Sequence, residues 1–198
     1  MGKFYFFYGA MNAGKTSMAI CKAHEFKEHG KKVYVFLPDN VYSPKIKSRN
    51  GLEIDTSGEL LGDSGLCSVA DDSVVIVDEA QFLSEEAIVK LKMLSINNNV
   101  LVFCFGLLTN FQIELFNGSK RLIEVADSIR EIPSMCDCCD HKAQYNLRLS
   151  DEKEEIVLDR LKYKGLCAKC YFKYTNERKK AEELGNQSSE CGCGICGC

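Results

Sequence analysis

The sequence predicts an α/β fold, in which helices flank a parallel sheet, followed by a small cysteine-rich domain. Strand-like and helix-like segments alternate over residues 1–132, a glycine-rich loop joins the first strand-like run to the first helix, and most cysteines lie in the last third of the chain. Alternating β and α segments are typical of a parallel sheet with helices on both faces. The predicted domains are residues 1–132 and 133–185, with a tail over residues 186–198.

Short runs of aromatic and β-branched residues indicate the strands of the first domain. They are Phe4–Tyr8, Val33–Leu37, Val74–Val77 and Val100–Phe105. Every residue of the run Val74–Val77 is apolar, as expected of a strand that is covered on both faces of a parallel sheet.

Capping residues indicate where the helices begin and end. Lys15–His29 is predicted to be a helix closed by Gly30, because glycine most often follows the last helical residue. Ser84 is a good N-cap for a second helix, and Ser119 is expected to cap the last helix of the domain. Residues 42–65 mix polar residues with weak periodicity, which indicates a flexible insertion.

Composition and charge exclude several classes of protein. The chain has 198 residues, 45% of them hydrophobic and 27% charged, so it can bury a core. Its apolar runs are far shorter than the ~20 residues of a membrane span, and its N-terminus lacks the features of a signal peptide. The formal net charge of −3 argues against broad capture of nucleic acid. We therefore expect a cytoplasmic protein without membrane or nucleic-acid partners.

A phosphate-binding loop lies between the first strand and the first helix, matching the pattern G-x-x-x-x-G-K-[ST]. Backbone N–H groups of such a loop point at an anion, and the helix that follows presents its positive end to it. Lys15 is expected to reach the β- and γ-phosphates of ATP, and the Thr16 hydroxyl to bind Mg²⁺. The fold is thus predicted to be of the P-loop NTPase type. The predicted phosphate-binding residues of the loop are Gly9, Ala10, Met11, Asn12, Ala13, Gly14, Lys15 and Thr16.

Two carboxylates, Asp78 and Glu79, follow the apolar strand Val74–Val77. The carboxyl ends of parallel strands line the ligand crevice, so both side chains should face the phosphates. Asp78 is expected to support the metal, directly or through water, and Glu79 to take a proton from a nucleophile. The run Asp78–Gln81 also resembles the DExx box of helicases, but such motors need two nucleotide-binding cores. A single-core ATPase switch with a zinc-ribbon interaction module is the alternative.

Two C-x₂-C pairs indicate a structural zinc site, since such pairs in a chain without a signal peptide more often bind metal than form disulfides. Four thiolates make a closed tetrahedral site with no open position for a substrate. Such a site would fix both ends of residues 140–166. Cys138 and His141 are rival ligands, and a nucleic-acid-binding zinc ribbon is a rival use of the metal. The predicted ligands are Cys136, Cys139, Cys167 and Cys170.

The tail ends in a C-x-C-x₂-C-x-C pattern from Cys191 to Cys198. This pattern suits a soft metal. The low complexity of the surrounding residues favours a mobile terminus with exposed thiols.

Together these motifs resemble the type II thymidine kinases, over residues 3–172. The resemblance rests on the order and spacing of G-x-M-N in the phosphate loop, DEAQF after the buried strand, Phe105-Gly106-Leu107 with Phe111 and F-x-G-S behind it, and C-x₂-C followed by L-C-x₂-C-Y. It implies transfer of the γ-phosphate of ATP to the 5′-hydroxyl of thymidine or deoxyuridine, a step of pyrimidine salvage.

The resemblance also implies roles for individual residues. Glu79 would be the general base at the 5′-hydroxyl, Asp39 would join Thr16 at the Mg²⁺ site, and Asp78 and Gln81 would lie beside the phosphates. Residues 140–166 would form a lasso over the base, with an aromatic ring stacked on the pyrimidine. The residues implied around the nucleoside are Met11, Gln81, Phe82, Leu107, Phe111, Phe116, Asn146 and Tyr163.

Cofactors and partners follow from the same resemblance. It implies structural Zn²⁺, Mg²⁺ bound with ATP, a homotetramer, and feedback inhibition by thymidine triphosphate. The sequence departs from the family at Val41, where an arginine is usual, and at Asn146, where threonine is frequent. Asn146 leaves the preference between thymine and uracil open. Arg49 lies in the predicted insertion, residues 42–65, and is a candidate source of positive charge near the phosphates.

Overall fold

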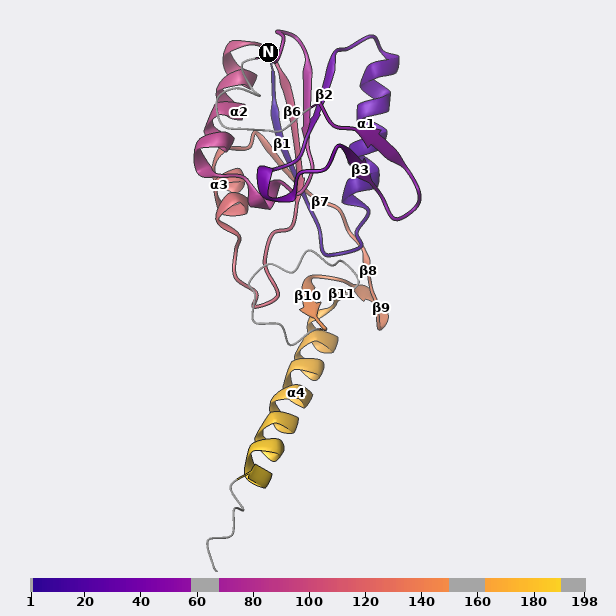
Figure 1. The fold of residues 1–198 in the computed structure, drawn as a ribbon, viewed down its shortest axis with the longest axis vertical. Helices are drawn as coiled ribbons and strands as arrows, with labels where there is room; N and C mark the ends of the chain where they lie inside the picture. Colours follow the sequence, from indigo (N-terminus) through magenta and orange to yellow (C-terminus); the bar gives the residue numbers. More distant parts are fainter. Residues whose placement is uncertain (1, 58–67, 150–162, 190–198) are drawn as a thin grey trace, which may run out of the picture.

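The computed structural model describes residues 2–57, 68–149 and 163–189, with side chains as far as residue 178. Its main sheet is parallel throughout, in the order β2-β5-β6-β1-β7 (Figure 1). The strands are β1 (Phe4–Tyr8), β2 (Val33–Phe36), β5 (Val74–Val77), β6 (Leu101–Gly106) and β7 (Ser128–Glu131). The predicted parallel sheet is confirmed, and β7 is an additional edge strand.

The α-helices of the described ranges are α1 (Lys15–Glu28), α2 (Glu85–Asn97), α3 (Asn117–Val125) and α4 (Ala168–Ser189). Two predicted boundaries are confirmed. Gly30 adopts φ +72° just after α1, and its N–H donates to the Lys27 carbonyl. The Ser84 hydroxyl accepts the Ala87 N–H at 3.1 Å at the start of α2. No helix within the described ranges is long and apolar enough to cross a membrane.

The prediction that Ser119 caps the third helix is wrong. α3 begins at Asn117, two residues earlier, and Phe116 at the cap position makes no side-chain hydrogen bond to the helix. Ser119 is fully buried, and its hydroxyl donates to the Leu107 carbonyl, so the serine ties α3 to the loop after β6.

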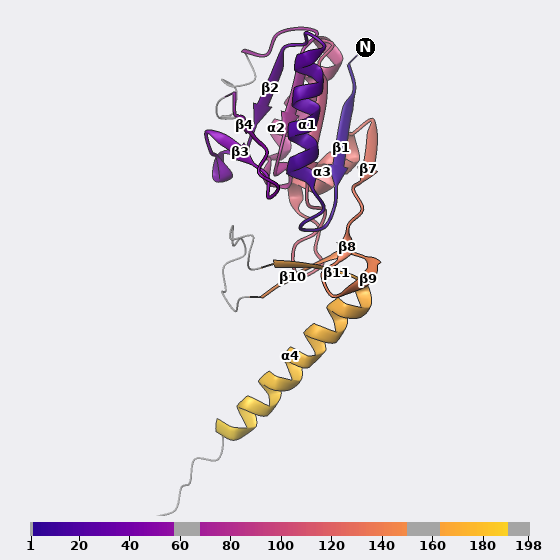
Figure 2. The same ribbon diagram turned by 90° about the vertical axis from the view of Figure 1, so that its right-hand side faces the viewer.

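Helices cover both faces of the sheet because successive residues of each strand point in opposite directions. Phe6 points to one face and joins the core formed with Ile88 of α2 and Leu122 of α3. Phe7 points to the other face, where the core includes Ile20 of α1. Figures 1 and 2 show α1 on one side of the sheet and α2 with α3 on the other.

Part of the predicted flexible insertion is ordered. Residues 45–55 form an antiparallel hairpin of β3 (Lys45–Lys47) and β4 (Glu53–Asp55). Ile46 and Ile54 face each other across it and are buried in the core on the α1 side. The prediction therefore fails over this hairpin, because one apolar pair is enough to anchor it but too short to give a periodic pattern.

A second module follows the sheet. It contains β8 (Met135–Cys136), β9 (Cys139–Lys142), β10 (Tyr145–Arg148) and β11 (Tyr163–Leu166), which form two antiparallel pairs. Leu147, Leu166 and Tyr171 of α4 form its small core together with cysteine side chains. Figures 1 and 2 show the module at the carboxyl edge of the main sheet, with α4 leading away. The boundaries of the predicted domains stay a prediction.

Candidate functional site

The phosphate loop curls at the carboxyl end of β1. Asn12 and Gly14 adopt left-handed φ angles of 67° and 79°. A Cβ at Gly9 would lie 2.6 Å from the Ile132 carbonyl oxygen, so only glycine fits there. The Lys15 ammonium is buried and donates to the Gly9 and Ala10 carbonyls at 3.1 and 2.9 Å. The amine is thereby held over the loop, where a phosphate would meet it.

A cavity of about 90 Å³ lies beside this loop. It brings five of the eight predicted loop residues together with the hairpin turn and with Glu79, the second residue after β5. Its lining consists of Met11, Asn12, Gly14, Lys15, Thr16, Ser17, Ser48, Arg49 and Glu79. We call it the phosphate cavity.

The two carboxylates after β5 take different positions. Asp78 is buried, and its Oδ2 accepts the Thr16 hydroxyl at 2.8 Å. A hydroxyl and a carboxylate side by side are the hard oxygen ligands that suit Mg²⁺, so these two residues fit that ion. Asp39 is exposed and lines a different cavity, with Phe82 and Lys90, so the structure does not bring it to Thr16.

Glu79 is held in a strained conformation next to Asp78. Its backbone is left-handed, with φ 53° and ψ 34°, which is uncommon for a residue with a Cβ and concentrates at functional sites. The Gln81 amide donates to Glu79 Oε2 at 2.8 Å, and Gln81 Oε1 accepts the Leu107 N–H at 3.0 Å. Gln81 is buried and orients the carboxylate, so the side chain of Glu79 has a fixed direction.

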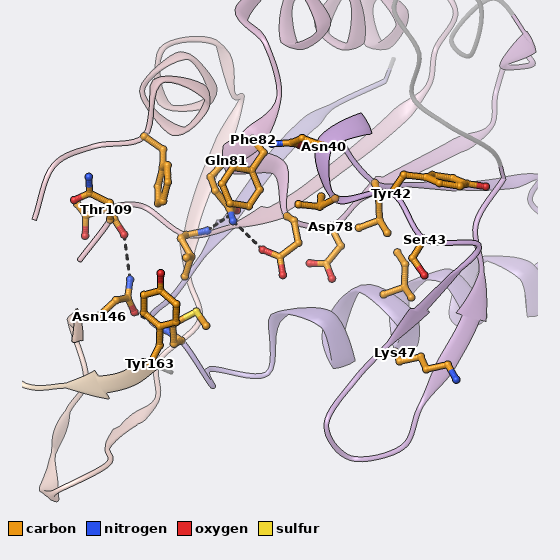
Figure 3. A pocket seen from close by; sticks show the side chains of 18 of the residues that line it. Asn40, Tyr42, Ser43, Lys47, Asp78, Gln81, Phe82, Thr109, Asn146 and Tyr163 are labelled. Carbon is orange, nitrogen blue, oxygen red and sulfur yellow. Dashed lines mark hydrogen bonds between the residues drawn. The ribbon is translucent and has the colours of Figure 1, made fainter. Parts of the chain in front are cut away.

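A larger cavity of about 450 Å³ adjoins the phosphate cavity, and Met11 and Glu79 line both. Figure 3 shows Asn146 beside Tyr163, with Tyr42, Ser43 and Lys47 across the cavity from them. We call it the acceptor cavity. Its lining includes all the residues implied around the nucleoside, namely Met11, Gln81, Phe82, Leu107, Phe111, Phe116, Asn146 and Tyr163.

Three phenylalanine rings of the acceptor cavity are held in place by contacts with neighbouring side chains. Phe82 and Phe116 meet edge to face with ring centres 5.6 Å apart. The Arg148 guanidinium lies 3.8 Å from the centre of the Phe111 ring. Such contacts fix flat apolar surfaces in a site that also offers hydrogen-bonding groups, which is typical of small-molecule pockets.

Sequence reasoning missed the wall contributed by the segment after β2. Leu37, Asn40, Val41, Tyr42, Ser43, Lys45, Ile46 and Lys47 all line the acceptor cavity. Apart from Val41, which stands where the family usually has an arginine, no motif marks them, because the segment after β2 and the hairpin reach the site through tertiary packing. The apolar Ile46 between two lysines was the available signal in the sequence. Val41 lies in the acceptor cavity and not in the phosphate cavity, which Arg49 lines instead.

Asn146 joins two loops rather than standing free in the acceptor cavity. It is 4% exposed, its Oδ1 accepts the Met11 N–H at 2.7 Å, and its amide donates to the Thr109 carbonyl at 3.1 Å. Both ends of the amide are therefore used within the protein. Its main role in this structure is to connect β10 to the phosphate loop and to the loop after β6.

The predicted cysteine ligands converge in the second module. The sulfur atoms of Cys136, Cys139, Cys167 and Cys170 all lie within 4.8 Å of one another. Cys139 Sγ is 3.6 Å from the sulfur atoms of both Cys167 and Cys170. A tetrahedron with metal–sulfur bonds of ~2.3 Å has edges of roughly 3.8 Å, so the four thiols fit zinc.

The rival ligands lie outside this group. Cys138 is exposed, and its thiol contacts the Tyr174 hydroxyl at 3.8 Å. His141 Nδ1 lies 3.4 Å from Cys139 Sγ, where it contacts a ligand rather than replacing one. Burial opposes ionisation of Cys136, but the N–H groups of Cys167 and Cys138 lower the pKa of its thiol to about 7. The hydrogen bond that Cys170 makes to Cys139 instead raises the pKa of the Cys170 thiol to about 12, so the thiols of the group differ in how readily they ionise.

The second module also contacts the phosphate loop directly. The Asp137 carboxylate accepts the Gly165 N–H at 2.8 Å and the Asn12 side-chain amide at 3.4 Å. A Cβ at Gly165 would lie 2.8 Å from the Met11 carbonyl oxygen, so the two backbones are close. Within the predicted lasso, residues 150–162 lie outside the described residues, as do the tail cysteines from Cys191 onward.

Comparison with known proteins gives a consistent result. The family model described as "Thymidine kinase" matches residues 2–171. The thymidine kinase of Mesorhizobium japonicum is 36% identical over 182 residues, covering 84% of this chain and 89% of that protein. That of Haemophilus influenzae is 36% identical over 165 residues, covering 79% and 85%. That of Streptococcus pyogenes is 33% identical over 192 residues, covering 87% and 98%.

Proposed function

The chain belongs to the thymidine kinase family, and on that premise we propose that it transfers the γ-phosphoryl group of ATP to the 5′-hydroxyl of thymidine or deoxyuridine. Membership of this family makes it an ATP-dependent nucleoside kinase. The observation that carries the finer proposal is the position of Glu79. This carboxylate lines both the phosphate cavity and the acceptor cavity, so it lies where a phosphoryl donor and an alcohol would meet.

The proposed step uses Glu79 as a general base. The 5′-oxygen attacks the γ-phosphorus, the bond from that phosphorus to the β–γ bridging oxygen breaks, and ADP leaves. The proton of the 5′-hydroxyl passes to Glu79, which Gln81 orients. General base catalysis contributes about 10²–10⁴-fold in rate, and the remainder comes from positioning and electrostatics.

The phosphate loop supplies the electrostatic part of this proposal. Lys15 and the backbone N–H groups of residues 9–14 would stabilise charge on the phosphoryl group during transfer. Thr16 and Asp78 would hold the Mg²⁺ that accompanies ATP, because their oxygen atoms are adjacent. When bound, that ion neutralises phosphate charge. Asp39 at this ion remains a proposal.

The acceptor cavity would take the nucleoside. Its volume of about 450 Å³ and its aromatic walls suit a pyrimidine and a deoxyribose. We propose that Tyr163 stacks on the base, and that Phe82, Leu107, Phe111 and Phe116 enclose base and sugar. Zn²⁺ at the four cysteines would fold the module that carries Tyr163. A homotetrameric state, inhibition by thymidine triphosphate and a cytoplasmic location are also part of the proposal.

A panel of nucleosides tests the proposed reaction. The protein is incubated with ATP labelled in the γ-phosphate, with Mg²⁺ and with one nucleoside at a time, and the labelled products are identified. Thymidine and deoxyuridine should yield labelled 5′-monophosphates, with one ADP formed per product. Equal ATP turnover with and without nucleoside would contradict the proposal and favour an ATPase switch.

A further inference from the structure

We infer that Arg49, at the turn of the β3–β4 hairpin, is the second cation of the phosphate site and stabilises the charge on the phosphoryl group during its transfer. This role rests on the proposed kinase reaction. Among the described residues that line the phosphate cavity, the cationic side chains are Lys15 and Arg49. Lys15 comes from the first turn of α1, whereas Arg49 comes from the turn of the β3–β4 hairpin.

The hairpin is built to hold its turn at this place. Ile46 and Ile54 anchor its two strands in the core on the α1 side. The Ser17 hydroxyl, in the first turn of α1, donates to Asn50 Oδ1 at 3.0 Å. Because Asn50 follows Arg49 in the turn, this bond fixes the arginine relative to the phosphate loop.

Hydrogen bonds within the turn add to its rigidity. Ser48 is buried, and its N–H and hydroxyl both donate to the Leu52 carbonyl, at 2.8 and 3.0 Å. Gly51 adopts φ +85°, a left-handed conformation that lets the chain reverse without strain. The turn is thus a defined structure, and Arg49 is presented from a fixed backbone.

Arg49 and the two lysines of the hairpin line different cavities. Lys45 and Lys47 pair with Glu53 at 2.9 and 3.4 Å, and both lysines line the acceptor cavity. Arg49 lines the phosphate cavity, where Glu79 contributes a negative charge. A phosphoryl group moving beside a carboxylate is repelled by it, and a cation in the same cavity offsets this repulsion.

The chemistry of the guanidinium group suits this role. Its planar fork donates two parallel hydrogen bonds to phosphate oxygens, which a lysine ammonium does not do. In phosphoryl transfer the charge is spread over the three equatorial oxygens of the moving group, and an arginine that meets them there acts mainly on kcat. Arg49 would bind those oxygens in addition to Lys15.

Steady-state kinetics of Arg49 variants tests the inference. In Arg49→Gln we expect kcat to fall by at least ~10²-fold, since arginines in this role contribute about 10³–10⁵-fold in other phosphoryl-transfer enzymes. The KM for ATP should change far less than kcat. Arg49→Lys should recover only part of the loss. Arg130→Gln, the same change at an exposed arginine of β7, should leave kcat unaltered.

A second variant tests the position of the arginine without removing it. Asn50→Ala deletes the acceptor of the Ser17 hydroxyl and should lower kcat in the same direction as Arg49→Gln. Adding Asn50→Ala to Arg49→Gln should then cost little more, because the two changes act on one interaction. Thermal unfolding of each variant identifies any general loss of folding.

Two outcomes would overturn the inference. One is a normal kcat in Arg49→Gln. The other is a raised KM for ATP with kcat retained, which would make Arg49 a ground-state anchor of ATP. The proposed function fails in a different way, when the wild-type chain phosphorylates no nucleoside, so the two failures are distinguishable.

Discussion

Asn146 has a different role in the structure from the one that the resemblance implies. The resemblance to thymidine kinases implies a place for it beside the 5-position of the base. In the structure, both ends of its amide are engaged with the Met11 N–H and the Thr109 carbonyl. A residue used in this way holds the phosphate loop, so its effect on base preference would be indirect.

Replacing Asn146 with alanine should therefore destabilise the fold. The change leaves the Met11 N–H and the Thr109 carbonyl without their partner, and a buried polar group left unsatisfied costs about 1–3 kcal/mol. Chemical denaturation should show a loss of this size in the free energy of unfolding. Asn97→Ala, at an exposed position near the end of α2, is the control and should change it by less than about 0.5 kcal/mol. Equal losses in both variants would contradict the account of Asn146.

Among the elements, those buried on both faces were predictable. β1, β5 and β6 are strongly apolar or aromatic and lie inside the sheet, so their sequences alone indicated strands. The edge strand β7 has the sequence SIRE and is mostly exposed, so no pattern marked it. The hairpin was missed because its only buried pair is Ile46 and Ile54.

The same limit applies to the site. The phosphate loop is one continuous stretch of sequence, and so is the pair Asp78–Glu79, so each was found from a local pattern. The wall formed by the segment after β2 and the first strand of the hairpin, from Leu37 to Lys47, reaches the acceptor cavity through tertiary packing. Such contacts leave no mark within the segment itself. Asp39 was assigned from the resemblance alone, and the structure places it at another cavity.

Asp127 links three elements and should make stability depend on pH. Its carboxylate accepts the Phe4 N–H at 2.8 Å, which ties the start of β7 to β1, and it pairs with Lys92 of α2. The hydrogen bond from Lys92 is the main reason that the pKa of Asp127 lies below its ordinary value. Because the pKa is lower in the folded state, the charged carboxylate stabilises the fold at pH values above the unfolded pKa of about 3.9. This stabilisation is lost as the pH falls through the folded pKa.

Denaturation of Asp127→Asn across pH checks this link. At neutral pH the variant should be less stable than the wild type, and the difference should shrink as the pH falls below about 4. Asp71→Asn, which alters an exposed carboxylate, serves as the comparison. A stability difference that stays constant from pH 7 to pH 2 would rule out the pairing.

At the scale of the whole molecule, the cysteine module and the α/β domain act on one site. The module contributes Asn146 and Tyr163 to the acceptor cavity, and its Asp137 contacts Asn12 of the phosphate loop. Its own core is small and consists partly of the cysteines themselves. Its order should therefore depend on the metal, as in other small metal-stabilised modules.

Cys167→Ala tests this dependence. We expect the variant to lose its bound zinc, measured by elemental analysis, and to bind thymidine much more weakly, with a smaller loss of ATP affinity. The control is Cys138→Ala, because Cys138 lies in the turn between the ligands Cys136 and Cys139 but outside the ligand group. Full zinc occupancy in Cys167→Ala, or loss of zinc in Cys138→Ala, would show that the ligand set is wrong.

The most direct test of the whole account is a single-turnover measurement on Glu79→Gln, paired with calorimetric binding of thymidine. Glutamine keeps the shape of the side chain and can still bond to Gln81, but it cannot accept the 5′-hydroxyl proton. We predict that phosphoryl transfer slows by at least ~10²-fold while thymidine affinity is largely retained. An unchanged rate of transfer in this variant would remove Glu79 as the base and contradict the mechanism.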